Sequence, residues 1–163
     1  MKRIGILSDT HCFLPDRMFG FFEDVEEIWH AGDIGNLETL ERLEKFKPLK
    51  AVYGNIDGTE IRSRCPEIRI FSCEDLSVLM MHIGGYPGRY SRDAKGLIEK
   101  HHPDLFICGH SHILKVIYDH KFKMLTINPG SAGKFGFHKS ITMIRIVIDG
   151  KNPKDLEVLD LPK

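Results

Sequence analysis

The chain lacks closely paired cysteines, long apolar segments and an excess of charge of either sign. Its four cysteines, Cys12, Cys65, Cys73 and Cys108, form no C-x-x-C pair, which argues against a zinc ribbon. With 163 residues, the chain is long enough to bury a continuous core without disulfide bridges. The cysteines are therefore expected to serve neither as structural metal ligands nor as covalent cross-links.

No segment has the pattern of a targeting or membrane sequence. The N-terminus lacks the apolar core of a signal peptide, and no apolar stretch approaches the roughly 20 residues of a membrane span. We therefore expect a cytoplasmic protein with no membrane partner. Internal repeats, low-complexity tracts and Ser/Gly linkers are also absent, so a single domain over residues 1–163 is predicted.

The charges balance, with 23 Lys and Arg residues against 23 Asp and Glu residues. Proteins that bind duplex nucleic acid usually carry a basic surface, because phosphate contacts dominate their affinity. The zero net charge therefore does not favour nucleic acid as a partner.

The first third of the sequence alternates between strand and helix patterns. Asn36 is a good N-cap for the second helix, whose leucines recur with a period near 3.6. Such alternation favours parallel strand pairing in an α/β fold. The expected strands cover residues 4–7, 27–30 and 49–53, and the expected helices cover residues 15–23 and 37–46.

The remainder is richer in strands, with a single further helix expected over residues 91–102. Joined to the α/β part, it suggests two sheets packed face to face with helices outside. The expected strands cover residues 67–72, 76–82, 105–108, 114–118, 124–128, 141–148 and 156–161.

Polar side chains follow five of these strands. A single Asp or Asn in such a place is usually a turn former, so the argument depends on the whole set. In open α/β sheets, ligands lie beyond the carboxyl ends of strands, which brings these residues together. Oxygen and nitrogen ligands without thiolate suit manganese, iron, cobalt or zinc, and a shared carboxylate can bridge two cations. The residues are Asp9, His11, Asp33, Asn55, His82, His110 and His112.

In this order, the motifs Asp-x-His, Gly-Asp, Gly-Asn, His and Gly-His-x-His resemble those of the calcineurin-like metallophosphoesterase superfamily. The chain length and the segment Asn128-Pro129-Gly130-Ser131 are similar to its small bacterial and archaeal phosphodiesterase branch. The resemblance spans essentially the whole chain. It implies a four-layer αββα fold, in which a two-sheet β-sandwich is flanked by helices.

The resemblance also implies roles for the ligand candidates. One divalent cation would be held by Asp9, His11 and His112, and a second by Asn55, His82 and His110, with Asp33 bridging both. Manganese is the expected metal, with iron, zinc, cobalt and nickel as alternatives. Asp33 and Asn55 would be the catalytic residues, and Asn55 would also contact the phosphate. The implied reaction is in-line attack by a bridging hydroxide on a small phosphoester substrate, either a phosphodiester or a phosphomonoester.

The sequence departs from the family pattern at two places. Many members have a histidine after the Gly-Asn asparagine that protonates the leaving group, and here that residue is Ile56. Asp57 could replace it only if its carboxyl group stayed protonated. General acid help is worth roughly 10²–10⁴-fold, so we expect aryl phosphodiesters to react far faster than alkyl ones. The segment after His82 also lacks the usual second histidine, and Arg89 in the loop beyond it is a candidate phosphate contact.

Other interpretations are retained. A non-catalytic interaction scaffold of the same fold occurs in the retromer complex, although its relative there has lost ligand histidines. A phosphomonoesterase or a nuclease would use the same chemistry, but nuclease members are longer. The physiological substrate stays open, as does a homo-oligomer formed through exposed strand edges and the apolar residues 19–22. His30 is expected to support its loop and Cys12 to be partly buried. Lys134 and His138 are candidate phosphate contacts like Arg89, with a solvated side chain as the default expectation.

Overall fold

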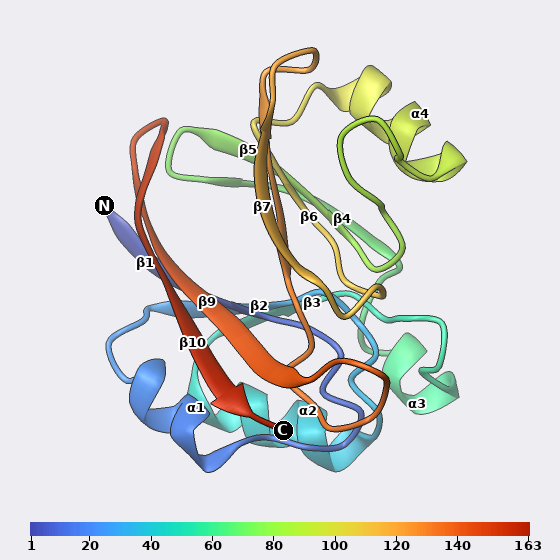
Figure 1. The fold of residues 1–163 in the computed structure, drawn as a ribbon, viewed down its shortest axis with the longest axis vertical. Coiled ribbons are helices and arrows are strands. Elements are labelled where there is room, and N and C mark those ends of the chain that lie inside the picture. Colours follow the sequence, from blue (N-terminus) through green and yellow to red (C-terminus); the bar gives the residue numbers. More distant parts are fainter.

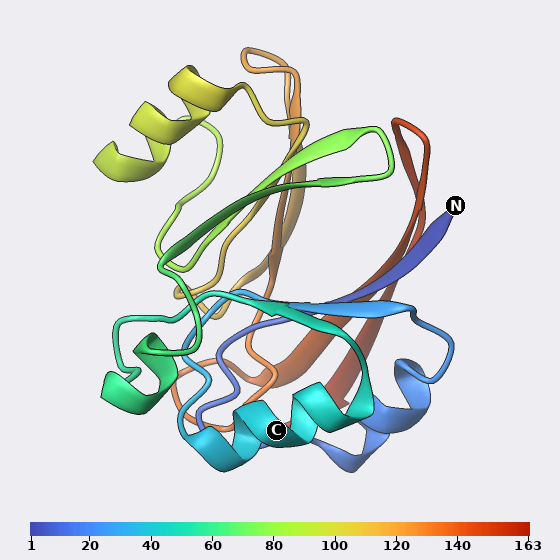
Figure 2. The same ribbon diagram turned by 180° about the vertical axis from the view of Figure 1, so that it is seen from behind.

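A computed structural model describes residues 1–163 as two five-stranded sheets that face each other, with helices on both outer sides (Figures 1 and 2). The strand order is β10-β9-β1-β2-β3 in the first sheet and β4-β5-β6-β8-β7 in the second. The predicted two-sheet α/β fold is therefore confirmed. No helix is long and apolar enough to cross a membrane.

The first sheet is built around three parallel strands, β1 (Lys2–Leu7), β2 (Glu27–His30) and β3 (Leu49–Ala51). They alternate with α1 (Asp16–Phe21) and α2 (Leu37–Phe46), so their carboxyl ends all lie at one edge. Two long antiparallel strands, β9 (Ser140–Asp149) and β10 (Asn152–Pro162), extend the sheet on the other side.

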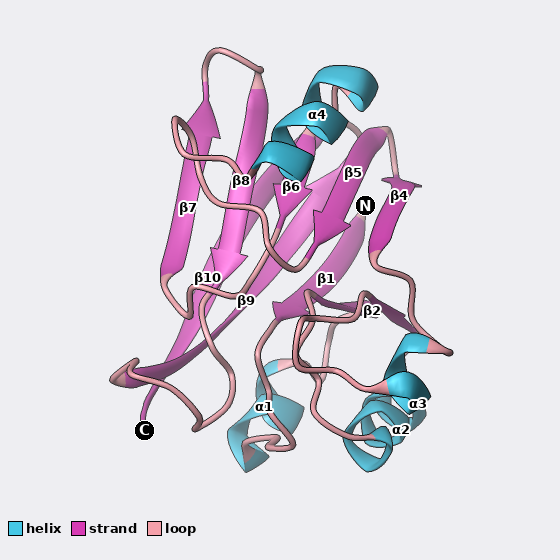
Figure 3. Ribbon diagram, turned by 90° about the vertical axis from the view of Figure 1, so that its right-hand side faces the viewer, coloured by secondary structure: helices cyan, strands magenta, loops and turns pink.

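The second sheet has a parallel centre and antiparallel edges. The strands β5 (Leu76–Met81), β6 (Leu105–Ile107) and β8 (Met124–Pro129) run parallel, flanked by β4 (Ile68–Cys73) and β7 (Leu114–Asp119). The helix α4 (Arg92–His101) covers the outer face, opposite to α1, α2 and α3 (Thr59–Arg62) in Figure 3. The second sheet thus has its own outer layer.

Strand periodicity assigns the apolar side chains to separate cores. In β1, Ile4 and Ile6 point between the sheets, where they join Met80 and Ile107 of the second sheet. Leu7 belongs instead to the cluster beneath α1 and α2. Because successive side chains of a strand alternate between faces, one short run contributes to two layers.

The helix boundaries follow their capping residues. The side chain of Asn36 accepts a hydrogen bond from the Thr39 amide, which confirms it as the N-cap of α2. Ser91 caps α4 in the same way through the Ala94 amide. α1 is shorter than predicted, and α3 was not predicted, since Gly58 precedes it without a side-chain cap.

The aromatic residues proposed as a dimer face are used within the chain. Phe22 is fully buried in the cluster under α1, and the Phe19 ring packs at 5.0 Å from that of Phe46. The apolar side of this helix therefore packs within the chain and gives no support to a homo-oligomer through residues 19–22.

Candidate metal centre

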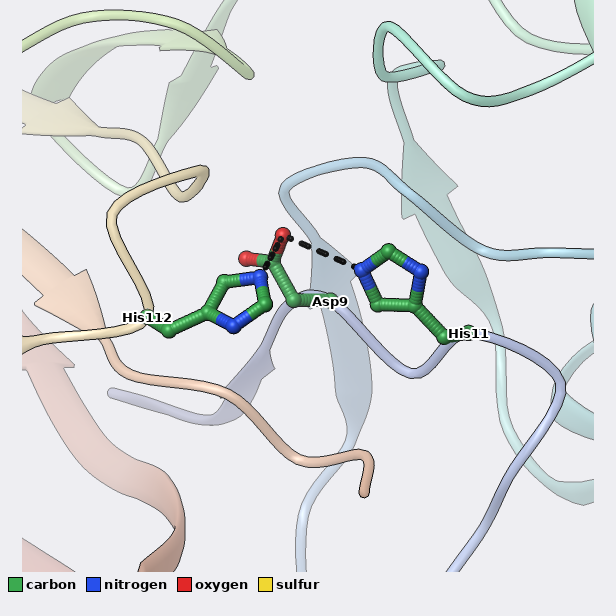
Figure 4. Close-up of side chains that lie close together, drawn as sticks. All are labelled: Asp9, His11 and His112. Carbon is green, nitrogen blue, oxygen red and sulfur yellow. Dashed lines mark ion pairs between the residues drawn. The ribbon is translucent and has the colours of Figure 1, made fainter. Parts of the chain in front are cut away.

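The loops that follow β1, β2, β5 and β6 meet between the two sheets and bring the predicted ligands together. Ligating atoms of Asp9, His11 and His112 lie within 4.8 Å of one another, as do those of Asp33, His82 and His110. Figure 4 shows the first group, with both imidazoles directed at the Asp9 carboxylate. Asn55 lies at the edge, where its Oδ1 is 3.1 Å from Nδ1 of His110.

The two oxygens of Asp9 have different surroundings. Oδ2 accepts hydrogen bonds from the Ser8 hydroxyl at 2.7 Å and from the His110 amide at 3.1 Å. Oδ1 lies 3.2 Å from Nε2 of His112 and 3.8 Å from Nε2 of His11, without a hydrogen bond. The protein thus fixes one oxygen and leaves the other facing the imidazoles.

The two oxygens of Asp33 also have different surroundings, and one of them lies near both groups of candidate ligands. Its Oδ1 accepts a hydrogen bond from the Ile56 amide at 3.1 Å. Its Oδ2 lies 3.1 Å from Nε2 of His82 and 3.6 Å from Nε2 of His11. This oxygen therefore reaches one imidazole of each group, although Oδ1 of Asp9 also lies 3.7 Å from His82.

The tautomer of His82 follows from its second nitrogen. Nδ1 lies 2.7 Å from the carbonyl oxygen of Ala31, and since a carbonyl only accepts, Nδ1 carries the proton. In the neutral ring Nε2 then has a free lone pair, which faces the Asp33 carboxylate. Two electron-rich atoms at this distance repel each other unless a proton or a metal ion lies between them.

Three buried atoms at the centre have no hydrogen-bond partner: Oδ1 of Asp9, Nε2 of His11 and Nε2 of His82. Buried polar atoms are nearly always paired, so three unpaired atoms in one space point to a missing charged ligand. All three are good donors for a divalent cation of intermediate hardness. The residues present therefore fit a metal centre.

The electrostatics are consistent with this geometry. Burial alone would raise the pKa of Asp9, but the imidazoles of His11 and His112 outweigh burial and lower it. Burial alone would likewise lower the pKa of His82, yet the Asp33 and Asp9 carboxylates raise it. Each carboxylate thus stays ionised because positive charge is favoured beside it.

The ligand loops adopt an unusual backbone. Five of the seven candidate ligands have positive φ, a region that residues other than glycine rarely adopt. Such conformations cost roughly 1–3 kcal/mol each and cluster at functional sites. Gly54 adds a steric requirement, because a Cβ there would lie 2.1 Å from Oδ1 of Asp33. The five ligands are Asp9, His11, Asp33, His110 and His112.

The segment Asn128-Pro129-Gly130-Ser131 forms hydrogen bonds to the loops that carry the candidate ligands. The Asn128 amide donates hydrogen bonds to the carbonyl of Gly109 at 2.9 Å and to the hydroxyl of Ser111 at 3.0 Å. The Ser131 hydroxyl donates to the carbonyl of Asp9 at 3.0 Å. One segment of the chain thus braces the loops of both metal groups.

His138 contacts the candidate ligand His112, a contact that the sequence did not predict. Its Nδ1 lies 3.2 Å from Nδ1 of His112, and its Nε2 lies 2.7 Å from the carbonyl of Gly133. Because the carbonyl fixes the proton on Nε2, Nδ1 of His138 accepts from His112, whose Nε2 is then free to face Asp9. Only the path of the loop over residues 130–139 creates this contact, so no sequence spacing indicates it.

Two neighbouring polar residues have structural roles. His30 accepts a hydrogen bond from the Gly32 amide and contacts the Thr10 hydroxyl at 3.0 Å, so it supports its loop as expected. The carboxylate of Asp57 accepts three backbone hydrogen bonds, from Ile34, Gly35 and Gly54. It is therefore occupied in joining two ligand loops rather than available to replace a proton donor.

Three further positions complete the comparison with the sequence. Ile56 is 46% exposed at the rim of the centre, and its apolar side chain cannot donate a proton. Cys12 is exposed, not partly buried as expected. Arg89 does not join the ligands and lies instead on a separate pocket that shares His110 with the metal centre.

Comparison with known proteins agrees with this architecture. A model of the calcineurin-like phosphoesterase superfamily domain matches residues 1–151. The chain belongs to the calcineurin-like phosphoesterase superfamily. Within this superfamily, a probable metallophosphoesterase of Methanothermobacter thermautotrophicus is 33% identical over 135 residues, which cover 78% of the chain and 76% of the relative.

Solved structures share the superfamily fold at low identity. Vps29 of Chaetomium thermophilum has a TM-score of 0.77 at 15% identity and covers 100% of both chains. Wild-type Vps29 of Entamoeba histolytica, complexed with zinc, has a TM-score of 0.74 at 17% identity and covers 97% of this chain and 98% of its own. These two likenesses establish the fold alone.

Proposed function

We propose that the protein is a metal-dependent phosphoesterase, and specifically a phosphodiesterase, with two divalent cations in its active site. The observation that carries this proposal is the set of three buried donor atoms that face one another without hydrogen-bond partners. When bound, the cations supply a hydroxide nucleophile for in-line attack and neutralise charge on the phosphoryl group.

In this proposal each group of side chains would hold one cation, and Asp33 would contribute to both. The short distances from Oδ2 of Asp33 to an imidazole of each group support its bridging role. Manganese is the proposed metal, because the donors are oxygen and nitrogen without thiolate, with iron, zinc, cobalt and nickel as alternatives. The cations would be held by Asp9, His11 and His112, and by Asn55, His82 and His110.

The residues at the rim would act on the substrate. Asn55 is exposed beside His110, so its amide nitrogen can donate to a phosphoryl oxygen while its Oδ1 faces Nδ1 of His110. Ile56 cannot donate a proton, so the leaving oxygen departs as an anion. Substrates with stable leaving groups, such as aryl phosphodiesters, are therefore favoured.

The experiment is hydrolysis of bis(4-nitrophenyl) phosphate and 4-nitrophenyl phosphate by the purified protein, with Mn²⁺ and with a chelator. We expect turnover of both that depends on metal, with the diester preferred. An alkyl diester is expected to react at least about 10²-fold more slowly. Comparable rates on aryl and alkyl diesters would contradict the role given to Ile56, and turnover in the chelator would contradict the metal mechanism.

A second candidate is a non-catalytic interaction scaffold, which the likeness in fold to Vps29 favours. Exposed isoleucines directly follow three candidate ligands, at Ile56, Ile83 and Ile113, and give the rim an apolar character. Binding of metal without turnover of any phosphoester would support this candidate over the first.

A further inference from the structure

A pocket of about 280 Å³ adjoins the metal centre on the side of His110. Its walls come from the loop after β5 and from the start of β7, and its floor includes Cys108 and Ile127. The volume is close to the lower end of the about 300–1,000 Å³ typical of small-molecule sites. A single phosphoryl group would fill only part of this space.

The pocket carries positive charge without compensation. Arg89 and Lys115 both line it, no Asp or Glu does, and neither cation takes part in an ion pair. The cavity on the other side of the centre, near His82, contrasts with it because Glu67 and Asp93 line that cavity together with arginines. Of the two, only the pocket beside His110 is suited to an anion.

The structure fixes the backbone that carries Arg89 and the side chain of Lys115, whereas the Arg89 guanidinium itself is exposed. Hydrogen bonds from the Arg89 amide to the Tyr86 carbonyl at 2.8 Å and from Ser91 to Gly84 at 2.9 Å close the loop that carries Arg89. Gly85, with φ of +91°, is required there, since a Cβ would lie 2.2 Å from the Arg89 carbonyl oxygen. The ammonium group of Lys115 lies 3.6 Å from the centre of the Tyr86 ring, a cation–π contact.

We propose that this pocket binds the organic part of the substrate, and that Arg89 and Lys115 bind a second phosphate group on it. The proposal rests on the proposed phosphoesterase function. The reacting phosphoryl group would lie at the metal ligands, of which the pocket shares only His110. Arg89 and Lys115 would therefore bind a second negatively charged group. The carbon skeleton that joins this group to the reacting phosphoryl group would lie on the apolar floor of the pocket. A nucleotide-like phosphoester with a second phosphate fits this chemistry.

The test compares two substrates with the same leaving group. One is the 4-nitrophenyl ester of thymidine 5′-monophosphate, and the other carries an additional 3′-phosphate. We expect the 3′-phosphate to lower KM by about tenfold or more, with little change in kcat, since it contributes binding rather than chemistry. Equal KM values would overturn the proposal while leaving the phosphoesterase function intact.

Matched variants assign the effect to the pocket. In R89Q/K115Q the preference for the additional phosphate should fall to about twofold or less. The control R17Q/K100Q removes the same charge from two exposed helical positions outside the pocket and should retain the full preference. If R89Q/K115Q keeps the preference, or if the control loses it, the pocket is not the phosphate site.

A binding measurement separates this proposal from the proposed function. Calorimetry with thymidine 3′,5′-bisphosphate and thymidine 5′-monophosphate, on Mn²⁺-loaded protein, requires no turnover. We expect tighter binding of the bisphosphate by about tenfold, lost in R89Q/K115Q. If neither substrate is hydrolysed but this difference persists, the phosphoesterase function fails and the pocket assignment stands. Equal affinities overturn the pocket assignment.

Discussion

The inner end and the rim of the metal centre are built in different ways. At the inner end, Asp9, Asp33 and His82 are buried, and each has a second atom hydrogen-bonded to the protein. At the rim, Asn55 and His110 are exposed, and the residue after Asn55 is Ile56, which cannot donate a proton. The fold thus fixes the positions of the inner candidate ligands, while the rim residues are accessible to a substrate.

The largest expected effect is at the centre of the inner end. Asp33→Asn should lower hydrolysis of an aryl phosphodiester by about 10³-fold or more, because a neutral amide replaces a bridging carboxylate poorly. Elemental analysis of the same protein should show fewer bound cations. Asp16→Asn, an exposed carboxylate on α1, is the control and should have no effect. A fully active Asp33→Asn protein would show that the bridge is elsewhere.

His30 is expected to make the folded protein less stable in acid. Burial lowers its pKa from 6.5 to about 4, against the opposing carboxylates of Asp57, Asp9 and Asp33. As pH falls from 6.5 to about 4, the unfolded chain binds a proton at His30 that the folded chain refuses. Stability should therefore decrease by about 3 kcal/mol across this window and recover as pH rises.

Urea unfolding in the presence of a chelator, at several pH values, measures this effect. The comparison is with His30→Gln, which keeps a side-chain donor for Thr10 but cannot titrate. The variant should show a pH dependence that is weaker by this amount. If wild type and His30→Gln have parallel pH profiles, the buried imidazole does not account for the acid sensitivity.

Variants of His138 test whether the hydrogen bond to the far nitrogen of the candidate ligand His112 contributes to metal binding. His138→Ala should weaken Mn²⁺ binding by about 10–100-fold, because His112 loses the acceptor that fixes its tautomer. His138→Gln offers an amide oxygen to His112 and an amide nitrogen to Gly133, so it should restore most of the affinity. Calorimetric titration with Mn²⁺ gives both values. An Ala variant with unchanged affinity would limit His138 to supporting its loop.

The smallest expected effect is a gain at the rim. Ile56→His introduces an imidazole at an exposed position beside Asn55, without disturbing buried groups. It should raise the rate on an alkyl phosphodiester by about tenfold and leave the aryl rate nearly unchanged, since only the poor leaving group needs protonation. Rates that rise equally on both substrates would indicate a change in binding instead.

Much of this architecture could be predicted from the sequence because local signals and tertiary structure agree. Apolar runs predicted the strands, Asn36 predicted the start of α2, and the polar residues at strand ends predicted the two groups of candidate ligands. Hydrogen bonds between the loops, such as those of Asp57 and Asn128, hold these residues close together. These hydrogen bonds could not be predicted, because they depend on loops without a periodic sequence pattern.

The rest could not be predicted because it depends on how loops return to the sheets. The contact between His138 and His112 joins residues 26 positions apart through a loop with no regular structure. The separation of Arg89 from the ligands likewise depends on a closed loop over residues 84–90. The helix α3 was missed because Gly58 gives no capping signal at its start.

The central claim is that two cations share the carboxylate of Asp33. Electron paramagnetic resonance of Mn²⁺-loaded protein tests it most directly, because bridged Mn²⁺ ions are magnetically coupled. We predict about two Mn²⁺ per chain and a coupled spectrum, which changes to that of an isolated ion in Asp33→Asn. A single Mn²⁺ per chain, or two uncoupled ions, would contradict the claim.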